Sequence, residues 1–96
     1  MALQILATGI NITTGAVSVG ATIPLKLDGS VPIFIRVTAS VAACVRVGNG
    51  AQTAVATDVV VQPGEAPVMF TGRCTNIAAI QQAAAGTVQI SPVEDI

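Results

Sequence analysis

The chain has 96 residues, 52% of them hydrophobic and only 9% charged, and its four Lys or Arg and five Asp or Glu give a net charge of −1. Soluble domains carry about 25% charged residues, so this chain has neither the basic field that nucleic acid requires nor enough charge to keep a free monomer from associating. The sequence also lacks His, the most common general acid and base, which argues against an enzyme.

The length suits one domain over residues 1–96 with a single hydrophobic core. The first 25 residues are uncharged, but Gly9, Gly15, Gly20 and Pro24 make them a poor membrane-spanning helix. No basic segment precedes an apolar run at the N-terminus, so a secretory signal is not expected. We therefore expect a soluble domain, without a membrane partner, that forms an oligomer or joins a larger assembly.

Short antiparallel strands are predicted because Gly or Pro recurs at intervals of about ten residues between segments rich in Val, Ile and Thr. Gly15 and Gly20 are expected at bends, and the Asp28-Gly29 pair predicts a turn over residues 27–30. The strands expected in this region cover residues 3–8, 10–13 and 16–19.

The clearest strand pattern covers residues 32–39, and a second strand with the same alternation follows over residues 43–47. Successive side chains of a strand point to opposite faces, so one face of this pair is apolar and the other carries Arg36 and Arg46. The apolar face comprises Ile33, Ile35, Val37, Ala43, Val45 and Val47. Phe34 and Phe70, the only aromatic residues, are expected in the core.

A tight hairpin turn is predicted at Asn49-Gly50, returning into a strand over residues 53–57. Residues 58–62 form a nearly continuous apolar run, which predicts a strand covered on both faces. Two prolines and a glycine require a loop over residues 63–67, and a strand resumes over residues 68–71.

The segment 75–85 is compatible with two structures. Asn76 as N-cap and Gly86 after the last turn would suit a short Ala-rich helix. Alternatively, residues 76–81 form a strand, 82–86 a turn and 87–91 the returning strand of a hairpin. The surrounding strands and the strand-like sequence TVQIS favour the hairpin. The tail, residues 92–96, is expected to be extended and partly exposed.

No catalytic, metal or cofactor site is predicted. Cys44 and Cys74 have neither a CxxC spacing nor a His with which to share a metal. Burial as reduced thiols is the favoured interpretation, and a disulfide between neighbouring strands is the alternative. The carboxylates lie in or beside predicted turns, where solvation explains them: Asp28, Asp58, Glu65, Glu94 and Asp95.

Three arginines are candidates for an interface. Arg36 and Arg46 lie in mid-strand and Arg73 at a strand end; on an isolated sheet they would simply be solvated. In an assembly, their guanidinium groups would suit carboxylates or carbonyls of a neighbouring protein. Loop residues expected to project toward that partner complete the candidate set: Asn49, Gly50, Pro63, Glu65 and Pro67.

From residue 32 onward the chain resembles small bacteriophage virion proteins made of a single antiparallel sandwich. The resemblance lies in a V-R-V-G strand, a Gly/Asn turn, an A-T-D segment, a P-G loop and a final IAAI…GTVQI segment. It implies a structural component of the virion, most specifically a capsid decoration (cement) protein that bridges neighbouring capsomers. Its partner would then be the major capsid protein or another virion protein, and such proteins are often trimeric jelly rolls.

The expected fold is an all-β antiparallel sandwich, jelly-roll-like, with about 7–9 short strands. The expected function is non-enzymatic and structural, with location in a virion assembled in the host cytoplasm. A neck, tail or fibre component is one alternative. A free binding module for carbohydrate or a host factor is another, although the lack of Trp and Tyr disfavours a sugar site.

Overall fold

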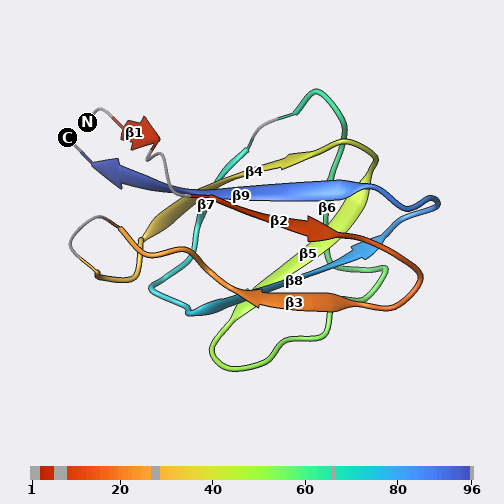
Figure 1. Ribbon diagram of the computed structural model, residues 1–96, viewed down its shortest axis with the longest axis horizontal. Helices are drawn as coiled ribbons and strands as arrows, with labels where there is room; N and C mark the ends of the chain where they lie inside the picture. Colours follow the sequence, from red (N-terminus) through yellow and green to blue (C-terminus); the bar gives the residue numbers. More distant parts are fainter. Residues whose placement is uncertain (1–2, 6–8, 27–28, 66, 96) are drawn as a thin grey trace.

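A computed structural model describes residues 3–5, 9–26, 29–65 and 67–95, of which residues 3–5, 69, 70, 94 and 95 are described by their backbone. These ranges contain nine strands and no helix. The strands form two antiparallel sheets that pack face to face (Figure 1). Sheet I contains β1 (Leu3–Ile5), β2 (Ile10–Thr13), β4 (Phe34–Ala39), β7 (Val68–Phe70) and β9 (Thr87–Asp95); sheet II contains β3 (Val19–Thr22), β5 (Ala43–Gly48), β6 (Val59–Val61) and β8 (Asn76–Gln81).

The strand order is that of a jelly roll. β1 and β2 pair with successive stretches of β9, Ile5 opposite Val93 and Ile10 opposite Ile90, on the side of β9 that β4 does not occupy. They therefore act as one interrupted strand, and sheet I reads β1/β2-β9-β4-β7 against β3-β8-β5-β6 in sheet II. This is the order of two Greek keys folded into a double sheet, which confirms the predicted antiparallel sandwich.

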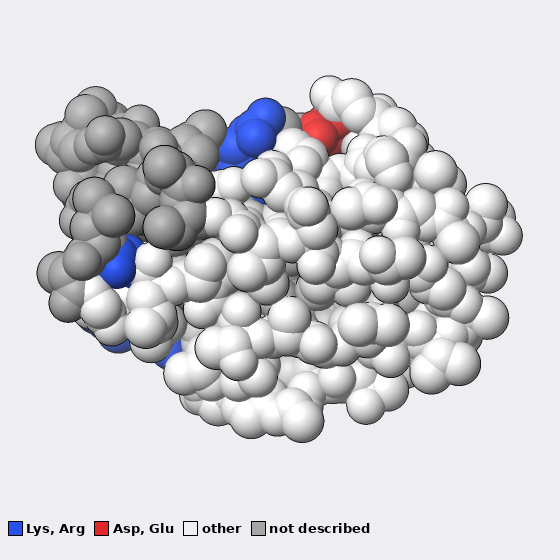
Figure 2. All heavy atoms as spheres, in the orientation of Figure 1, with Lys and Arg blue, Asp and Glu red and all other residues white. Residues whose placement is uncertain are grey.

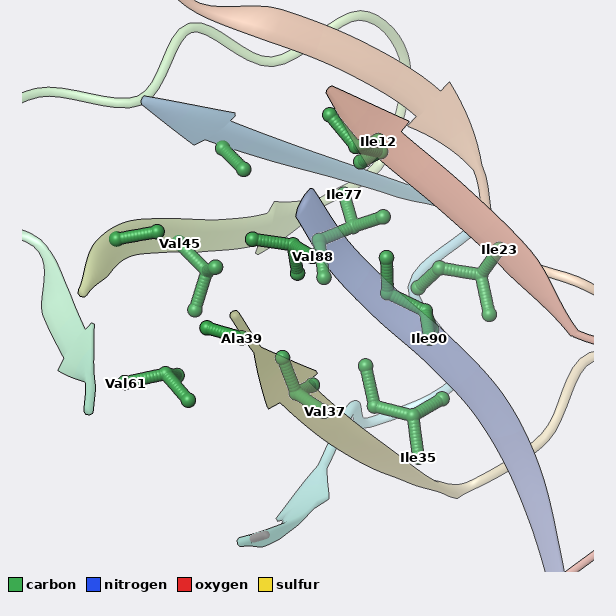
Figure 3. Packing of buried hydrophobic residues seen from close by; sticks show 12 residues of the cluster. Ile12, Ile23, Ile35, Val37, Ala39, Val45, Val61, Ile77, Val88 and Ile90 are labelled. Atoms are coloured by element: carbon green, nitrogen blue, oxygen red, sulfur yellow. The ribbon is translucent and has the colours of Figure 1, made fainter. Parts of the chain in front are cut away.

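The core lies between the sheets and follows the predicted alternation. Ile35 and Val37 of β4 are fully buried, and Val45 of β5 is 1% exposed. Figure 3 shows these side chains meeting those of β8 and β9 between the two layers. Arg36 and Arg46 point away from this core, as predicted. Phe34 shares the outward face with Arg36 and is half-buried, so its predicted place in the core is wrong; the side chain of Phe70 lies outside the described part.

The third strand lies three residues later than predicted. Residues 16–18 form a loop, and β3 runs from Val19 to Thr22, so Gly20 sits inside a strand instead of at a bend. Gly20 pairs with Ala78 of β8, and a Cβ at this position would make only an ordinary contact, 3.5 Å, with the backbone carbonyl of Gln52. Long-range pairing has therefore overridden the local tendency of glycine to break a strand.

The predicted strand over residues 53–57 does not form. Gly50 has a φ of +73°, a conformation that favours glycine, but residues 49–51 form a bend and the chain continues as a loop to residue 58, so the predicted tight hairpin is wrong. The loop ends in a turn in which Asp58 N donates to Val55 O at 3.0 Å. The next strand, β6, is an edge strand, and Val59 is 56% exposed. The prediction that this apolar run is covered on both faces is therefore wrong.

Residues 76–81 form strand β8 instead of a helix, and residues 82–86 form a turn. However, β8 belongs to sheet II and β9 to sheet I, so this turn is an arch between sheets and the predicted hairpin is wrong. β9 also continues through residue 95, pairing with β1 and β4. Residues 92–95 are thus extended, as predicted, and Pro92 and Val93 are buried; the side chains of residues 94–96, on which the predicted partial exposure depends, lie outside the described part.

Candidate interaction surface

Six of the eight candidate interface residues lie in loops on opposite sides of the sandwich, and Arg36 and Arg46 lie in mid-strand. Asn49, Gly50 and Arg73 occupy one end, where the Asn49 side chain accepts a hydrogen bond from Thr75 N at 3.3 Å. The segment from β6 to β7, which carries Pro63, Glu65 and Pro67, crosses the top of the view in Figure 1, whereas the chain after β5, with Asn49 and Gly50, lies at the bottom. A partner that touched both candidate loops would therefore have to reach across the molecule.

Arg46 is engaged within the chain. Its Nε and a terminal guanidinium nitrogen donate to Asp58 Oδ1 at 3.2 and 3.1 Å, and Nε lies 3.1 Å from Oδ2. Asp58 Oδ2 also accepts a hydrogen bond from Val55 N at 2.8 Å. This backbone hydrogen bond is the main cause of a lowered pKa at Asp58, and Arg46 adds to it. The Asp58 carboxylate therefore links the 49–58 loop to β5.

We call the contacts of the Asp58 carboxylate with Arg46 and Val55 N the Asp58 clasp. They predict that this loop becomes looser in acid. Because the pKa of Asp58 is lower in the folded state than its usual 3.8, the unfolded chain binds the proton more tightly. The stabilisation is therefore complete above the usual pKa and is lost as pH falls through the lower, folded-state pKa. An NMR titration should show the Val55 amide shift following the Asp58 carboxyl, and Asp58→Asn should abolish that titration. A Val55 amide that does not respond to pH would contradict the clasp.

Arg36 and Arg73 occupy different settings. Arg36 is half-buried in mid-strand on the outward face of sheet I, and Arg73 is exposed in the turn between β7 and β8. Arg73 has a φ of +65°, a backbone conformation that is unfavourable for a residue with a Cβ. Thr71 holds this turn: its hydroxyl accepts from Arg73 N at 3.2 Å and donates to Pro32 O at 2.7 Å. Within the described ranges, Arg46–Asp58 is the only ion pair.

The 62–67 loop is closed by its own residues. Glu65 N donates to Gln62 O at 3.1 Å, and Glu65 Oε1 accepts from Gln62 N at 3.0 Å. Pro63 is exposed, whereas Pro67 is half-buried and its carbonyl accepts from Val37 N at 3.1 Å. Glu65 therefore stabilises the loop conformation, and its carboxylate remains at the surface.

The 49–58 loop covers the outward face of sheet II, a feature that the sequence pattern did not predict. Cys44 and Ala78 point to that face, yet both are fully buried. Ala54 N donates to Ser18 Oγ at 2.8 Å, and the Cys44 thiol lies 3.7 Å from Ala56 O. Both cysteines are free thiols, and Cys74 is half-buried. A Cβ at Gly48 would meet only the terminal amide of the Gln52 side chain, a flexible group that could move aside, so the sequence held no clear signal of this cover.

A shallow pocket of about 390 Å³ opens between this loop and the edge of sheet II. Every lining residue is uncharged, and polar groups come from Thr22, Gln52 and Asn76. Gln52 Nε2 is held by the carbonyls of Asn49 and Gly50 at 3.0 and 3.3 Å. Such a lining can form hydrogen bonds with a neutral ligand but offers no acid, base or nucleophile. The remaining lining residues are Gly20, Ala21 and Ala51.

At the end opposite Arg73, three loops form what we call the alanine tip: residues 14–18, 40–42 and 82–86. None of these residues is charged. Val17 is 77% exposed, and Ala16 and the run Ala83-Ala84-Ala85 are exposed as well. Figure 2 shows no Lys, Arg, Asp or Glu side chain on the visible face of this end, at the right of the view. The alanine run is evident in the sequence, but its position beside Val17 is not.

The described ranges contain no group of three or more His, Cys, Asp or Glu side chains that could hold a metal ion. They also contain no helix long and apolar enough to cross a bilayer. Every buried side-chain nitrogen or oxygen in these ranges has a hydrogen-bond partner, so the described interior contains no orphaned polar group that a ligand would satisfy. Comparison with protein-family models, with curated proteins and with solved structures finds no match for this chain.

Proposed function

We propose that this chain is a non-enzymatic structural component of a phage virion, a capsid decoration (cement) protein that stabilises the shell by bridging capsomers. The observation that supports the proposal best is the surface. Large aliphatic side chains are exposed at several separate places on a domain that carries few charges: Val17, Val19, Leu25, Val55, Val59 and Val68. With so few charges, a free monomer has little protection against association, which favours a protein that is covered in use. The jelly-roll order agrees, because this architecture recurs in viral capsid proteins.

The proposed mechanism relies on many weak contacts. Apolar contacts would supply affinity, and sparse charges at the rim of the interface would supply register. Because a lattice presents many identical sites to an oligomer, modest single contacts add up to tight binding. A homo-oligomer, with a trimer favoured, would give each particle several such contacts.

The test combines native mass with shell binding. We expect light scattering to give a closed oligomer whose mass is constant over a range of concentrations. We also expect the protein to co-sediment with capsids that lack it and to raise the temperature at which those capsids release their DNA. A monodisperse monomer that leaves capsids unbound and their melting unchanged would contradict the proposal. Binding to isolated necks, tails or fibres, and not to capsids, would indicate that the protein belongs to those parts of the virion.

The pocket beside Gln52 favours a second candidate, a binding module for a neutral, hydroxylated ligand such as a carbohydrate. Its volume of about 390 Å³ falls within the usual range for ligand sites, and its polar lining is uncharged. Specific signals on a glycan array that disappear in Gln52→Ala would support this candidate over the first. The lack of Trp and Tyr removes the aromatic platform that sugar sites commonly use.

A further inference from the structure

Given the proposed role in a virion, on which this inference rests, we propose that the alanine tip is the end that docks on the shell. The partner surface that receives the tip is an uncharged, apolar recess of the shell protein. The proposal follows from the rigidity of the tip, from its composition and exposure, and from the area that it can bury.

Hydrogen bonds that extend the β2–β9 and β4–β9 pairings of sheet I fix the tip. Thr14 N and its hydroxyl donate to Gly86 O at 2.8 and 3.1 Å, and Gly86 N donates back to the Thr14 hydroxyl at 2.9 Å. Ser40 N donates to Thr87 O at 2.9 Å, and Thr87 N donates to Ser40 Oγ at 2.8 Å. These two reciprocal pairs join all three loops, so docking would require little ordering of the backbone.

Two further backbone hydrogen bonds hold the tip loops in place. Gln82 N donates to Ala42 O at 3.2 Å, and Gln81 N donates to Gly15 O at 3.1 Å. Val17, at 77% exposure, and the alanine methyl groups are exposed there, together with the uncharged side chains of Ser40 and Gln82. Burying such a surface requires no desolvation of charge. A recess that receives it must likewise be uncharged, because a charge on the partner would be buried there without a counterion.

The available area indicates that the occupant is a larger partner and not a second copy of this chain. The end of the molecule is bounded by its two shorter dimensions, 28 and 19 Å. An elliptical face of that size is on the order of 400 Å², about half of the roughly 800 Å² per partner that a stable pair buries. Two tips meeting end to end would therefore be too small an interface.

Head-to-tail contact between copies is disfavoured as well. The opposite end carries exposed Arg73 and half-buried Lys26, and pressing the apolar tip against it would bury cations without partners. A recess in a shell avoids both the small contact area and the buried cations. Its walls contact the sides of the tip as well as its face, and it presents no cation. Several tips of one oligomer can then bind the same lattice at once.

The experiment compares three single substitutions that each place a carboxylate on an exposed side chain. Val17→Asp and Ala84→Asp charge the tip, and Leu25→Asp charges the opposite end, where Leu25 is 46% exposed. Circular dichroism melting curves first establish that each variant is folded. Co-sedimentation with purified capsids of the encoding phage, assembled without this protein, then gives the affinities.

We expect each tip variant to lose at least about tenfold in affinity, since its charge would be buried in an apolar recess, and Leu25→Asp to stay within about twofold of wild type. Wild-type binding with no loss in the tip variants would overturn the tip assignment and leave the cement function standing. A loss of binding in Leu25→Asp alone would have the same consequence. Wild-type protein that does not bind capsids would overturn the cement function and the tip assignment together.

Discussion

Replacing Ile35 with Ala is expected to lower the free energy of unfolding by about 2–5 kcal/mol, the usual loss for truncating a buried aliphatic side chain. Ile35 is fully buried on β4, which lies between β9 and β7 in sheet I. The lost side chain would leave a cavity between the sheets. Because β4 is hydrogen-bonded to a strand on each side, its backbone could move little to fill that cavity. Urea denaturation followed by far-ultraviolet circular dichroism measures the loss, since the chain has neither Trp nor Tyr as a fluorescent probe.

A matched control uses an aliphatic side chain on the surface of the other sheet. Val59 lies on edge strand β6 and is 56% exposed, so Val59→Ala should change the free energy of unfolding by no more than about 0.5 kcal/mol. Both variants must be compared at one protein concentration, because self-association would add to the apparent stability. Equal effects of the two substitutions would mean that β4 does not face the core as described.

Replacing Gly86 with Ala is expected to destabilise the fold by about 1–3 kcal/mol, the range for overpacking a close contact. A Cβ at this position would lie 2.8 Å from Val41 Cβ and 2.9 Å from Ser40 Oγ. These atoms are close to the backbone of the neighbouring loop and cannot swing away, so the 82–86 and 40–42 loops would have to separate. The Thr14–Gly86 hydrogen bonds would be strained at the same time.

Gly15, in the adjacent loop of the tip, provides the control. A Cβ there meets nothing within 4 Å, and the residue has no positive φ that would oppose a side chain. Gly15→Ala should therefore be neutral or stabilise the fold by up to about 1 kcal/mol, through loss of freedom in the unfolded chain. Thermal melting of the two variants side by side gives the comparison. Equal stability of Gly86→Ala and Gly15→Ala would show that the loops are not packed as tightly as described.

The strands that the sequence predicted correctly are those whose pattern is local. The alternation of Ile35 and Val37 with Arg36 identifies β4 and its buried face without knowledge of the partner strands, because the two-residue period belongs to the strand itself. Residues 63–67 are equally local, since two prolines and a glycine exclude a continuous ladder wherever the segment lies. The opposite facing of Arg46 and Val45 follows for the same reason.

The predictions that were wrong concern which distant strands pair and which loops cover the sheets. Residues 53–57 have a strand-like composition, but Asp58, Ser18 and Asn49 hold the surrounding loop over sheet II instead. Residues 76–81 and 87–91 are two strands as expected, yet they enter different sheets. Nothing in a short segment distinguishes a hairpin from an arch, because the choice depends on which third strand pairs more favourably.

Composition and two-residue alternation act within each segment, so they are sufficient to predict a neutral, all-β domain with its arginines on outward faces. The binding of Arg46 by Asp58 and the covering of outward-facing Cys44 depend instead on how the sheets and loops pack in space. The same packing places the candidate loops on opposite sides of the sandwich and gathers Val17 with the alanine run into one tip. The physical reason is that a jelly roll brings together loops far apart in the chain, and their neighbours are set by the pairing of whole strands.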